Sequence, residues 1–309
     1  MSQSFQVLCA ELGLHPESGD EHQLRILRQW CEAHISQDIV YTGTSVEQYS
    51  QYIALVKDYL EVFQENIPDE LTMFVPQWDD WSTLQYAAYQ GYDRYIASLS
   101  SVDSRAWNQG NAAGMTALHF AALQGHIHTL ELLLARGADP HIENYQKQLP
   151  IYSALVLPVW YADGLMEKKE KIFLLLKNAE SVMHPDASGD TVLHLMAMHG
   201  YEALSAEIVR DYPALVLECN HWRHYPIHTA ILNAQLPVAR ILLALPGVAE
   251  QADGHGRVPL HYAACYGSEE MVTLCCETAA DRNIHDSEGK TAKMLAHEQH
   301  NVEAIKVLG

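Results

Sequence analysis

The sequence has few positive charges. Lys and Arg contribute 19 residues against 39 Asp and Glu, which gives the 309-residue chain a formal net charge of −20. A surface of that sign repels phosphate backbones and anionic lipid headgroups. We therefore expect neither nucleic-acid nor membrane-surface binding, and the natural complement of such a chain is a protein that carries a basic patch. The one dense basic stretch, residues 167–171, is interleaved with acids and predicts a solvated helix face.

Long apolar runs and an ordered cysteine pattern are also missing. No run approaches the roughly 18 apolar residues that span a bilayer, and the first residues lack the basic and apolar segments of a signal peptide. The six cysteines form no CxxC pair, which is typical of reduced thiols in the cytosol. We expect a cytoplasmic monomer that holds no metal and no cofactor.

The sequence does contain a repeated motif. The segment GMTALHFAA at Gly114 returns as GDTVLH at Gly189 and as GRVPLHYAA at Gly256. Six copies carry an apolar anchor, at Leu84, Leu118, Ile151, Leu193, Ile227 and Leu260. The anchors are separated by steps of 34, 33, 42, 34 and 33 residues. A step near 33 residues that recurs in this way indicates a repeat architecture.

These motifs resemble the ankyrin-repeat family, whose unit is a β-turn followed by two helices with a T-P-L-H-x-A signature. The resemblance covers residues 78 to 309. It implies an all-α solenoid of about six or seven helix-turn-helix repeats with short β-turn fingers, and a function in protein binding. The helical periodicity of residues 1–75 does not match the repeat and predicts an N-terminal helical cap. The expected domains are therefore 1–75 and 76–309.

Local signals agree with short helices at the expected places. Thr116 and Thr191 stand where an N-cap oxygen is needed. Gly125, Gly200 and Gly267 follow the first helix of their repeats, where a residue with positive φ is common.

Histidine recurs at one position of the repeat. It occurs as His119, His194, His228 and His261, and is replaced by Gln85 and Tyr152 in other copies. Gln and Tyr keep a hydrogen-bonding group but would lose a metal ligand. Neighbouring copies would also lie about 8–10 Å apart, too far to share an ion. By resemblance, these side chains tie neighbouring turns together.

The segment HWRHYPIH, residues 221–228, places three histidines at i, i+3 and i+7. On a helix they would share one face and suggest a metal site. The repeat register instead assigns His221 and His224 to a turn and His228 to the structural position. The remaining unusual feature is Trp222 next to Arg223 at a projecting tip. We expect this tip to contact a partner, with packing back onto the next repeat as the alternative.

Candidate partner-binding residues follow from this register. They comprise Trp78, Tyr145, His221, Trp222 and Arg223 at turn tips, Tyr86, Tyr89, Phe120, Tyr262 and Tyr266 on the outward face of the first helices, and Trp160 in the insertion. The insertion, residues 155–166, accounts for the 42-residue step and is either a flap on the next repeat or a partner contact. Trp, Tyr and Arg are enriched in interface hot spots.

Three functional hypotheses follow. The first is non-catalytic protein binding through the concave groove; the degenerate repeats are similar to ankyrin proteins that intracellular bacteria deliver into host cells, which suggests an effector acting on a host protein. The second is an enzyme whose chemistry lies in residues 1–75, where Cys9 and Cys31 accompany several histidines, with the repeats selecting the substrate. The third is autoinhibition of that segment by the repeats. Because the sequence has no glycine-rich phosphate loop, nucleophile elbow or acid pair, we favour the first.

Overall fold

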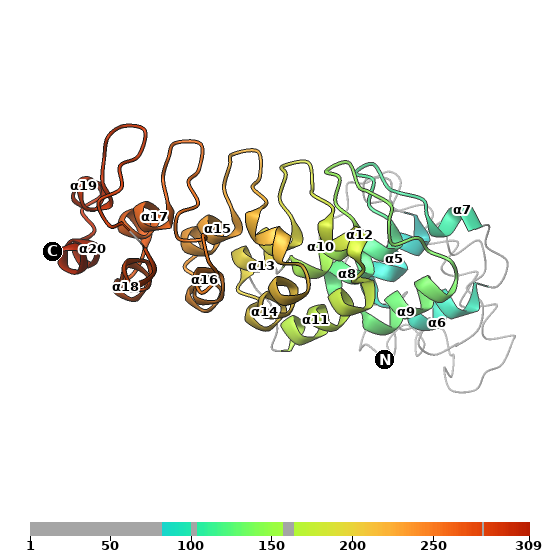
Figure 1. Cartoon of the computed structure of the whole chain (residues 1–309). Helices are drawn as coiled ribbons and strands as arrows, with labels where there is room; N and C mark the ends of the chain where they lie inside the picture. Colours follow the sequence, from blue (N-terminus) through green and yellow to red (C-terminus); the bar gives the residue numbers. More distant parts are fainter. Residues whose placement is uncertain (1–81, 100–103, 157–163, 280) are drawn as a thin grey trace, which may run out of the picture.

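The computed structural model describes residues 82–99, 104–156, 164–279 and 281–309. In these ranges short helices follow one another in pairs, and the long loops between pairs all project to one side (Figure 1). The described ranges contain no extended strand, only an isolated bridge between His285 and Thr291. The predicted all-α ankyrin-type solenoid is therefore confirmed. The predicted cap, residues 1–75, lies outside the described residues, as does most of the insertion.

The helices fall into two layers. The first helices of the repeats are α5 (Thr83–Gln90), α8 (Ala117–Gln124), α10 (Pro150–Leu155), α13 (Val192–His199), α15 (Pro226–Leu232), α17 (Pro259–Tyr266) and α19 (Ala292–Glu298). The second helices are α6 (Asp93–Ser98), α9 (Ile127–Ala135), α11 (Leu165–Leu176), α14 (Glu202–Asp211), α16 (Leu236–Leu243), α18 (Glu269–Thr278) and α20 (Val302–Leu308). Three short helices lie in connections: α7 (Ser104–Trp107), α12 (Ala179–Met183) and the 3-10 helix η1 (Pro213–Leu217).

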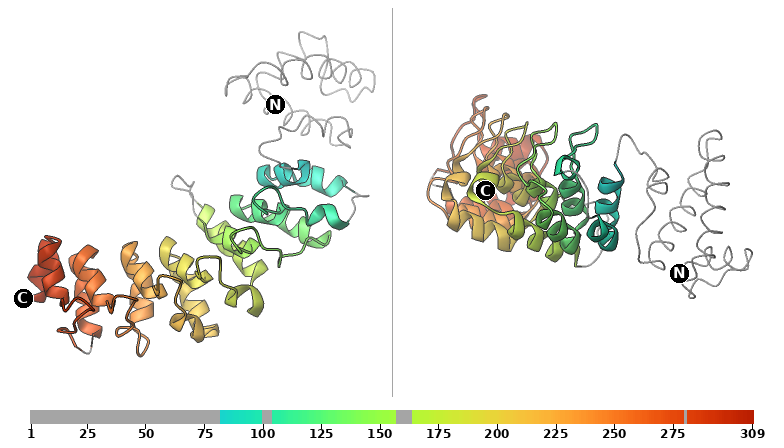
Figure 2. Two further views of the ribbon diagram at one scale, coloured as in Figure 1. Left: turned by 90° about the horizontal axis from the view of Figure 1, so that it is seen from above. Right: turned by 90° about the vertical axis from the view of Figure 1, so that its right-hand side faces the viewer.

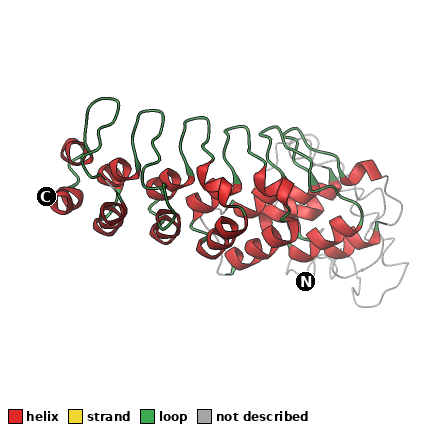
Figure 3. Cartoon of the chain, in the orientation of Figure 1, coloured by secondary structure: helices red, strands yellow, loops and turns green. Residues whose placement is uncertain are grey.

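Each first helix packs against the first helix of the next repeat, and the pairs form a curved row (Figure 2). Small residues permit this approach, since Ala121 and Ala122 in α8 and Ala263 and Ala264 in α17 are completely buried. The loops stand along one edge of the row, outside both layers (Figure 3). No helix in the described ranges is long and apolar enough to cross a membrane.

Two of the three predicted glycine caps are confirmed. Gly125 and Gly200 end α8 and α13 in the left-handed region, with φ of 79° and 78°. The prediction for Gly267 is wrong, because its φ is −81°. Glycine is needed there for a different reason: a Cβ would lie 2.7 Å from the carbonyl oxygen of Ala263.

The N-cap predictions are also confirmed. Thr116 and Thr191 adopt the extended backbone of an N-cap, and each forms a capping box with the histidine three residues later. The histidine side chain is therefore held in place by the N-cap of its own helix, and its other ring nitrogen points to the next repeat.

The irregular 42-residue step changes the packing between α11 and α14. Consecutive second helices elsewhere contact each other directly, whereas α11 and α14 do not form a comparable contact. Lys177, directly after α11, closes this junction: its Nζ lies 2.6 Å from Glu207 Oε1 and 2.9 Å from Asp211 Oδ2, both on α14. These partners raise the pKa of Lys177.

The insertion also explains a wrong prediction for the basic stretch. Lys169 in α11 is completely buried rather than solvated. Its Nζ donates to the carbonyl oxygens of Ser153, at 2.9 Å, and Val156, at 2.5 Å. These carbonyls lie at the end of the short helix α10, where no further helical turn supplies N–H groups to donate to them. Burial lowers the pKa of Lys169 to about 8.

Replacing Lys177 with Met should weaken the α11–α14 junction. We expect the thermal midpoint to fall by about 2 °C at low ionic strength, and by less in 1 M salt, because the partners are partly exposed and screened. Calorimetry at two salt concentrations measures this. Lys171→Met, at an exposed residue of α11 that forms no ion pair with the described residues, is the matched control. Equal midpoints for the two variants would contradict the assigned role.

Candidate partner-binding surface on the fingers and first helices

Six finger turns share one backbone design. They span residues 111–115, 144–148, 186–190, 220–224, 253–257 and 286–290. Each begins with Asn or Asp, whose Oδ1 accepts hydrogen bonds from the backbone N–H groups two and four residues later. In the fourth turn Asn220 Oδ1 accepts from Trp222 at 3.1 Å and from His224 at 3.0 Å. These backbone N–H groups of each turn are thereby hydrogen-bonded within the turn. The side chains at the tip are not needed to hold the turn together.

Neighbouring fingers are joined by backbone hydrogen bonds. The N–H of the second turn residue donates to a carbonyl of the preceding finger in four cases: Tyr145 to Ala113, Ala187 to Gln146, His221 to Ser188, and Ser287 to His255. The step from turn 220–224 to turn 253–257 has no such bond among the described residues. Side chains connect these two fingers instead: the Tyr262 hydroxyl donates to Asp253 Oδ2 at 2.7 Å and lies 2.9 Å from His224 Nε2.

The repeated histidines connect each first helix to the next finger, which confirms their predicted structural role. In His194, Nδ1 accepts from the backbone N–H of Thr191 at 3.1 Å, so the proton must be on Nε2. Nε2 then donates to the carbonyl of His224 at 3.0 Å. The same Nε2–carbonyl bond joins His119 to Gln148, His228 to Arg257 and His261 to Lys290.

The two substitutions preserve this connection. Gln85 Nε2 donates to the carbonyl of Met115 at 3.1 Å, while its Oε1 accepts from the N–H of Ser82 at 2.8 Å. The Tyr152 hydroxyl donates to the carbonyl of Asp190 at 3.0 Å. Different side chains therefore perform one task at this position.

Burial keeps the connecting imidazoles neutral. It lowers the pKa of His119 and of His228 to about 4, and it lowers the pKa of His194 and His261 as well. Within the described ranges, no group of three or more His, Cys, Asp or Glu side chains is placed to hold a metal ion. His221 and His224 lie in a turn before α15, so the helical face suggested by the spacing of residues 221–228 does not form.

Two finger tips carry large exposed aromatic side chains. Tyr145 is 77% exposed and Trp222 is 62% exposed. His221 and Arg223 beside Trp222 are exposed too. The alternative in which Trp222 packs back onto the next repeat is wrong, because most of the side chain faces solvent.

The predicted aromatic row on the first helices is largely covered, and two members need correction. Phe120 is only 3% exposed and packs edge-on against Tyr89, with ring centroids 6.2 Å apart. Tyr262 is 9% exposed and lies against His228. Each is covered because the neighbouring repeat packs over this side of its helix.

The remaining predicted residues differ in exposure. Tyr86 and Tyr89 are half-buried, and Tyr266 is 59% exposed. Trp78 and Trp160 lie outside the described residues.

At the position five residues after the apolar anchor, sequence reasoning identified Tyr89 but missed the apolar residues of other repeats. Met198 and Leu232 occupy this position and are 38% and 42% exposed. Leu123 is half-buried at the same position of its repeat. The repeat register alone could have identified this row, because these residues lie at the end of each first helix, where the next helix no longer covers them.

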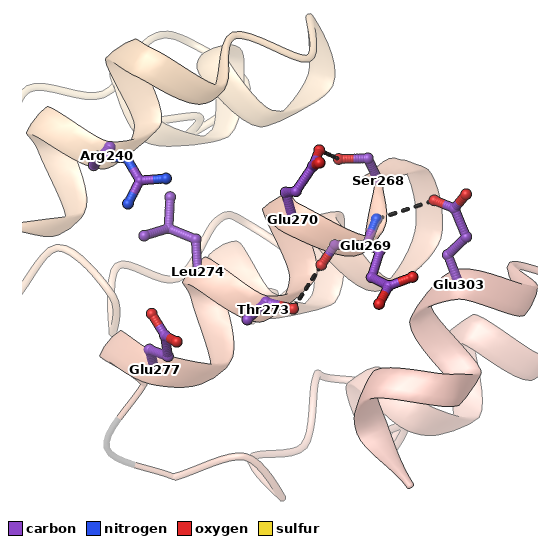
Figure 4. A pocket seen from close by; sticks show the side chains of 8 residues that line it. All are labelled: Arg240, Ser268, Glu269, Glu270, Thr273, Leu274, Glu277 and Glu303. Atoms are coloured by element: carbon purple, nitrogen blue, oxygen red, sulfur yellow. Dashed lines mark hydrogen bonds between the residues drawn. The ribbon is translucent and has the colours of Figure 1, made fainter.

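A polar hollow lies on the opposite layer, between α16, α18 and α20 (Figure 4). Its volume is about 570 Å³, and its lining comprises Arg240, Ser268, Glu269, Glu270, Thr273, Leu274, Glu277 and Glu303. Glu303 accepts from the backbone N–H of Glu269 at 3.0 Å. With four carboxylates and one apolar side chain, this hollow lacks the apolar lining of a small-molecule pocket.

Stacked helix pairs with protruding, mutually bonded turns define a repeat solenoid. The profile described as "Ankyrin repeats (3 copies)" matches residues 48–144 and 227–309, together more than half of the sequence. The chain therefore belongs to the ankyrin-repeat family.

Among curated proteins, the chain is similar to the human transient receptor potential cation channel subfamily A member 1, with 25% identity over 213 residues. This match covers 65% of the chain but only 18% of the channel. A probable E3 ubiquitin-protein ligase XBOS32 from Oryza sativa is 30% identical over 168 residues, or 53% of the chain and 30% of the ligase. The chain thus spans a minor part of these relatives.

Two solved structures share the fold. The human ASB11 ankyrin repeat domain has a TM-score of 0.57 at 20% identity, covering 74% of this chain and 98% of that one. The ankyrin repeat domain of Bcl-3 has a TM-score of 0.55 at 17% identity, covering 72% and 97%. At these identities the likeness establishes the architecture alone.

Replacing His194 tests the connection between helix and finger. His194→Ala should lower the free energy of unfolding by about 3 kcal/mol, because the part-buried carbonyl of His224 and the buried N–H of Thr191 lose their partner. His194→Gln should cost about 1 kcal/mol, since Gln85 makes both bonds in another repeat. Urea unfolding measures the difference. His128→Ala, an exposed control, should be neutral, and an Ala variant no weaker than the Gln variant would contradict the assignment.

The neutral histidines make the fold sensitive to mild acid. An unfolded histidine takes up a proton near pH 6.5, whereas folded His119 and His228 do so only near pH 4. Stability is therefore complete above pH 6.5 and falls as the pH drops toward 4. We expect a loss of about 2 kcal/mol per such histidine between pH 7 and pH 5. Urea titrations at both pH values measure it, and the double variant His119→Gln, His228→Gln should lose less than the wild type.

Proposed function

We propose that this chain is a non-catalytic protein-binding module whose partner contacts the finger tips and the adjoining ends of the first helices. One observation carries the proposal: the exposed aromatic rings of Tyr145 and Trp222 stand on turns whose backbones are already hydrogen-bonded. A rigid turn loses little entropy on binding, and large aromatic side chains supply most of the energy of typical interfaces.

The polar groups of the described repeats are used for structure. The repeated histidines are neutral and bonded on both ring nitrogens, so none of these four imidazoles is free to act as a base. Burial raises the pKa of Cys265 and Cys276, and that of Cys275 to about 12, so these thiols stay protonated at neutral pH. A nucleophilic cysteine needs the opposite shift. These features favour binding over catalysis for this part of the chain.

A finer hypothesis is that the protein acts as a bacterial effector on a host protein. It rests on the degenerate repeats, the unfamiliar helical cap expected in residues 1–75 and the lack of a recognised eukaryotic module in the sequence, and the relatives named above are not bacterial effectors. Fusion to a translocation reporter in an infected cell would test delivery separately from binding.

Partner capture with the full chain tests the proposal. Trp222→Ala should reduce the recovery of specific partners at least tenfold, because it removes a large exposed ring without touching the turn backbone. Quantitative mass spectrometry of the captured proteins measures this. Leu217→Ala, a residue 64% exposed in the connection before the finger, is the matched control. Unchanged recovery with Trp222→Ala would contradict the finger-tip surface.

A second pair of variants distinguishes the competing enzyme hypothesis from non-catalytic binding. Cys9→Ser and Cys31→Ser should leave partner recovery and cellular effect unchanged if the chain acts by binding. Loss of the cellular effect with intact recovery would instead assign chemistry to residues 1–75.

A further inference from the structure

The fourth residue of every finger turn adopts a left-handed backbone. Four turns place glycine there: Gly114, Gly189, Gly256 and Gly289, with φ between 70° and 79°. The other two turns place Lys147 and Arg223 there, with φ of 56° and 60°. These same two turns carry the exposed Tyr145 and Trp222. Strained backbone, a cation and an exposed aromatic therefore occur together twice, and only in these two of the six turns.

A non-glycine residue in this region is disfavoured because its Cβ approaches the backbone. Hydrogen bonds of the turn hold this backbone, from the Lys147 N–H to the Asn144 carbonyl at 2.9 Å and from the Arg223 N–H to the Asn220 carbonyl at 2.8 Å, but the two cationic side chains take no part in them. Neither the Lys147 nor the Arg223 side chain has a carboxylate within ion-pair distance or another polar partner among the described residues. Two further non-glycine residues with positive φ, Ala234 and His300, lie beyond the ends of first helices, away from the finger tips. Strain without an internal partner is a feature of functional sites.

Turns 144–148 and 220–224 each carry one cation and no carboxylate, although the chain as a whole has a charge of −20 and turn 186–190 between them carries Asp186 and Asp190. Asp186 is 8% exposed, and its carboxylate accepts from the N–H groups of Ser188 and Asp190 and from Gln148 Nε2. Asp190 is half-buried and accepts from Asn220 Nδ2. The acidic groups of turn 186–190 are thus engaged, while Lys147 and Arg223 are exposed.

We infer that turns 144–148 and 220–224 form a two-point docking edge for an extended acidic peptide segment of the partner. Two carboxylates of that segment pair with Lys147 and Arg223, and apolar groups beside them pack on Tyr145 and Trp222. The turn between them has only Ala187 and Ser188 at its tip, so the segment passes over it without obstruction. This inference rests on the proposed binding function. It assigns the partner an acidic segment at this edge, where net charge alone suggested a basic patch.

The repeat spacing sets the separation of the two carboxylates. The turns are two repeats apart, and each repeat advances by about 8–10 Å. An extended chain covers about 3.3 Å per residue. The acidic side chains should therefore be about five or six residues apart.

A random dodecapeptide library displayed on phage tests this inference against the full chain. Selection on the wild type should enrich pairs of Asp or Glu about five or six residues apart, next to an apolar residue. The enriched peptides, labelled and measured by fluorescence anisotropy, should bind the double variant Lys147→Gly, Arg223→Gly at least tenfold more weakly. Their affinity for the wild type should also fall steeply with salt. Lys171→Ala removes an exposed cation from α11 and should change nothing.

The stability of the same double variant separates function from structure. Because glycine relieves the left-handed strain, its thermal midpoint should equal or exceed that of the wild type. A lower midpoint would assign the two cations a structural role and overturn the inference. Enrichment of neutral or basic peptides, or of none, would also overturn it. The broader binding function would still stand in these cases if Trp222→Ala abolished partner capture, and would fall if it did not.

Discussion

The solenoid depends on one hydrogen bond per repeat, from a buried side chain of the first helix to the carbonyl that ends the next finger turn. The helix cap orients this side chain, because its other ring nitrogen accepts from the N-cap backbone, as in Thr191 and His194. The bond then fixes where the next turn ends and the next helix begins. Histidine can accept at Nδ1 and donate at Nε2 only when its imidazole is neutral. Burial between stacked repeats lowers the imidazole pKa, so the stacking itself keeps the ring in the required form.

This arrangement divides each finger into a fixed base and a variable tip. The first and fifth turn residues hold the backbone and receive the bond from the preceding repeat, so their chemistry is constrained. The side chains of the second and third residues carry no such duty, while the fourth residue must adopt a left-handed backbone. The corresponding tips therefore read Ala-Ala-Gly in turn 111–115 and His-Trp-Arg in turn 220–224. Recognition can change at the tips without altering the interactions that stack the repeats.

The repeat register, the first helices and the role of the four histidines could be predicted from the sequence, because each follows from local spacing and capping. The burial of Phe120 and Tyr262 could not. Helical periodicity shows which residues share a face, but in a solenoid the next repeat covers part of that face. Lys169 was misassigned for a related reason: its carbonyl partners lack donors from a following helical turn only because α10 ends at Leu155, where the insertion begins. Likewise, the glycine pattern predicted the turn at Gly267 but not the close backbone approach that requires it.

The acidic peptide that we infer differs from the basic patch expected from net charge for a physical reason. Coulombic attraction at an interface depends on charges within about a Debye length, roughly 8 Å at physiological salt, while the second helices and the fingers are separate layers of the molecule. The exposed carboxylates around Glu269 and Glu270 lie on the second-helix layer. Those of Asp186, Asp253 and Asp286 are buried within the turns that they hold together. A chain can therefore be acidic as a whole and still present exposed cations on the two turns whose aromatic side chains meet solvent.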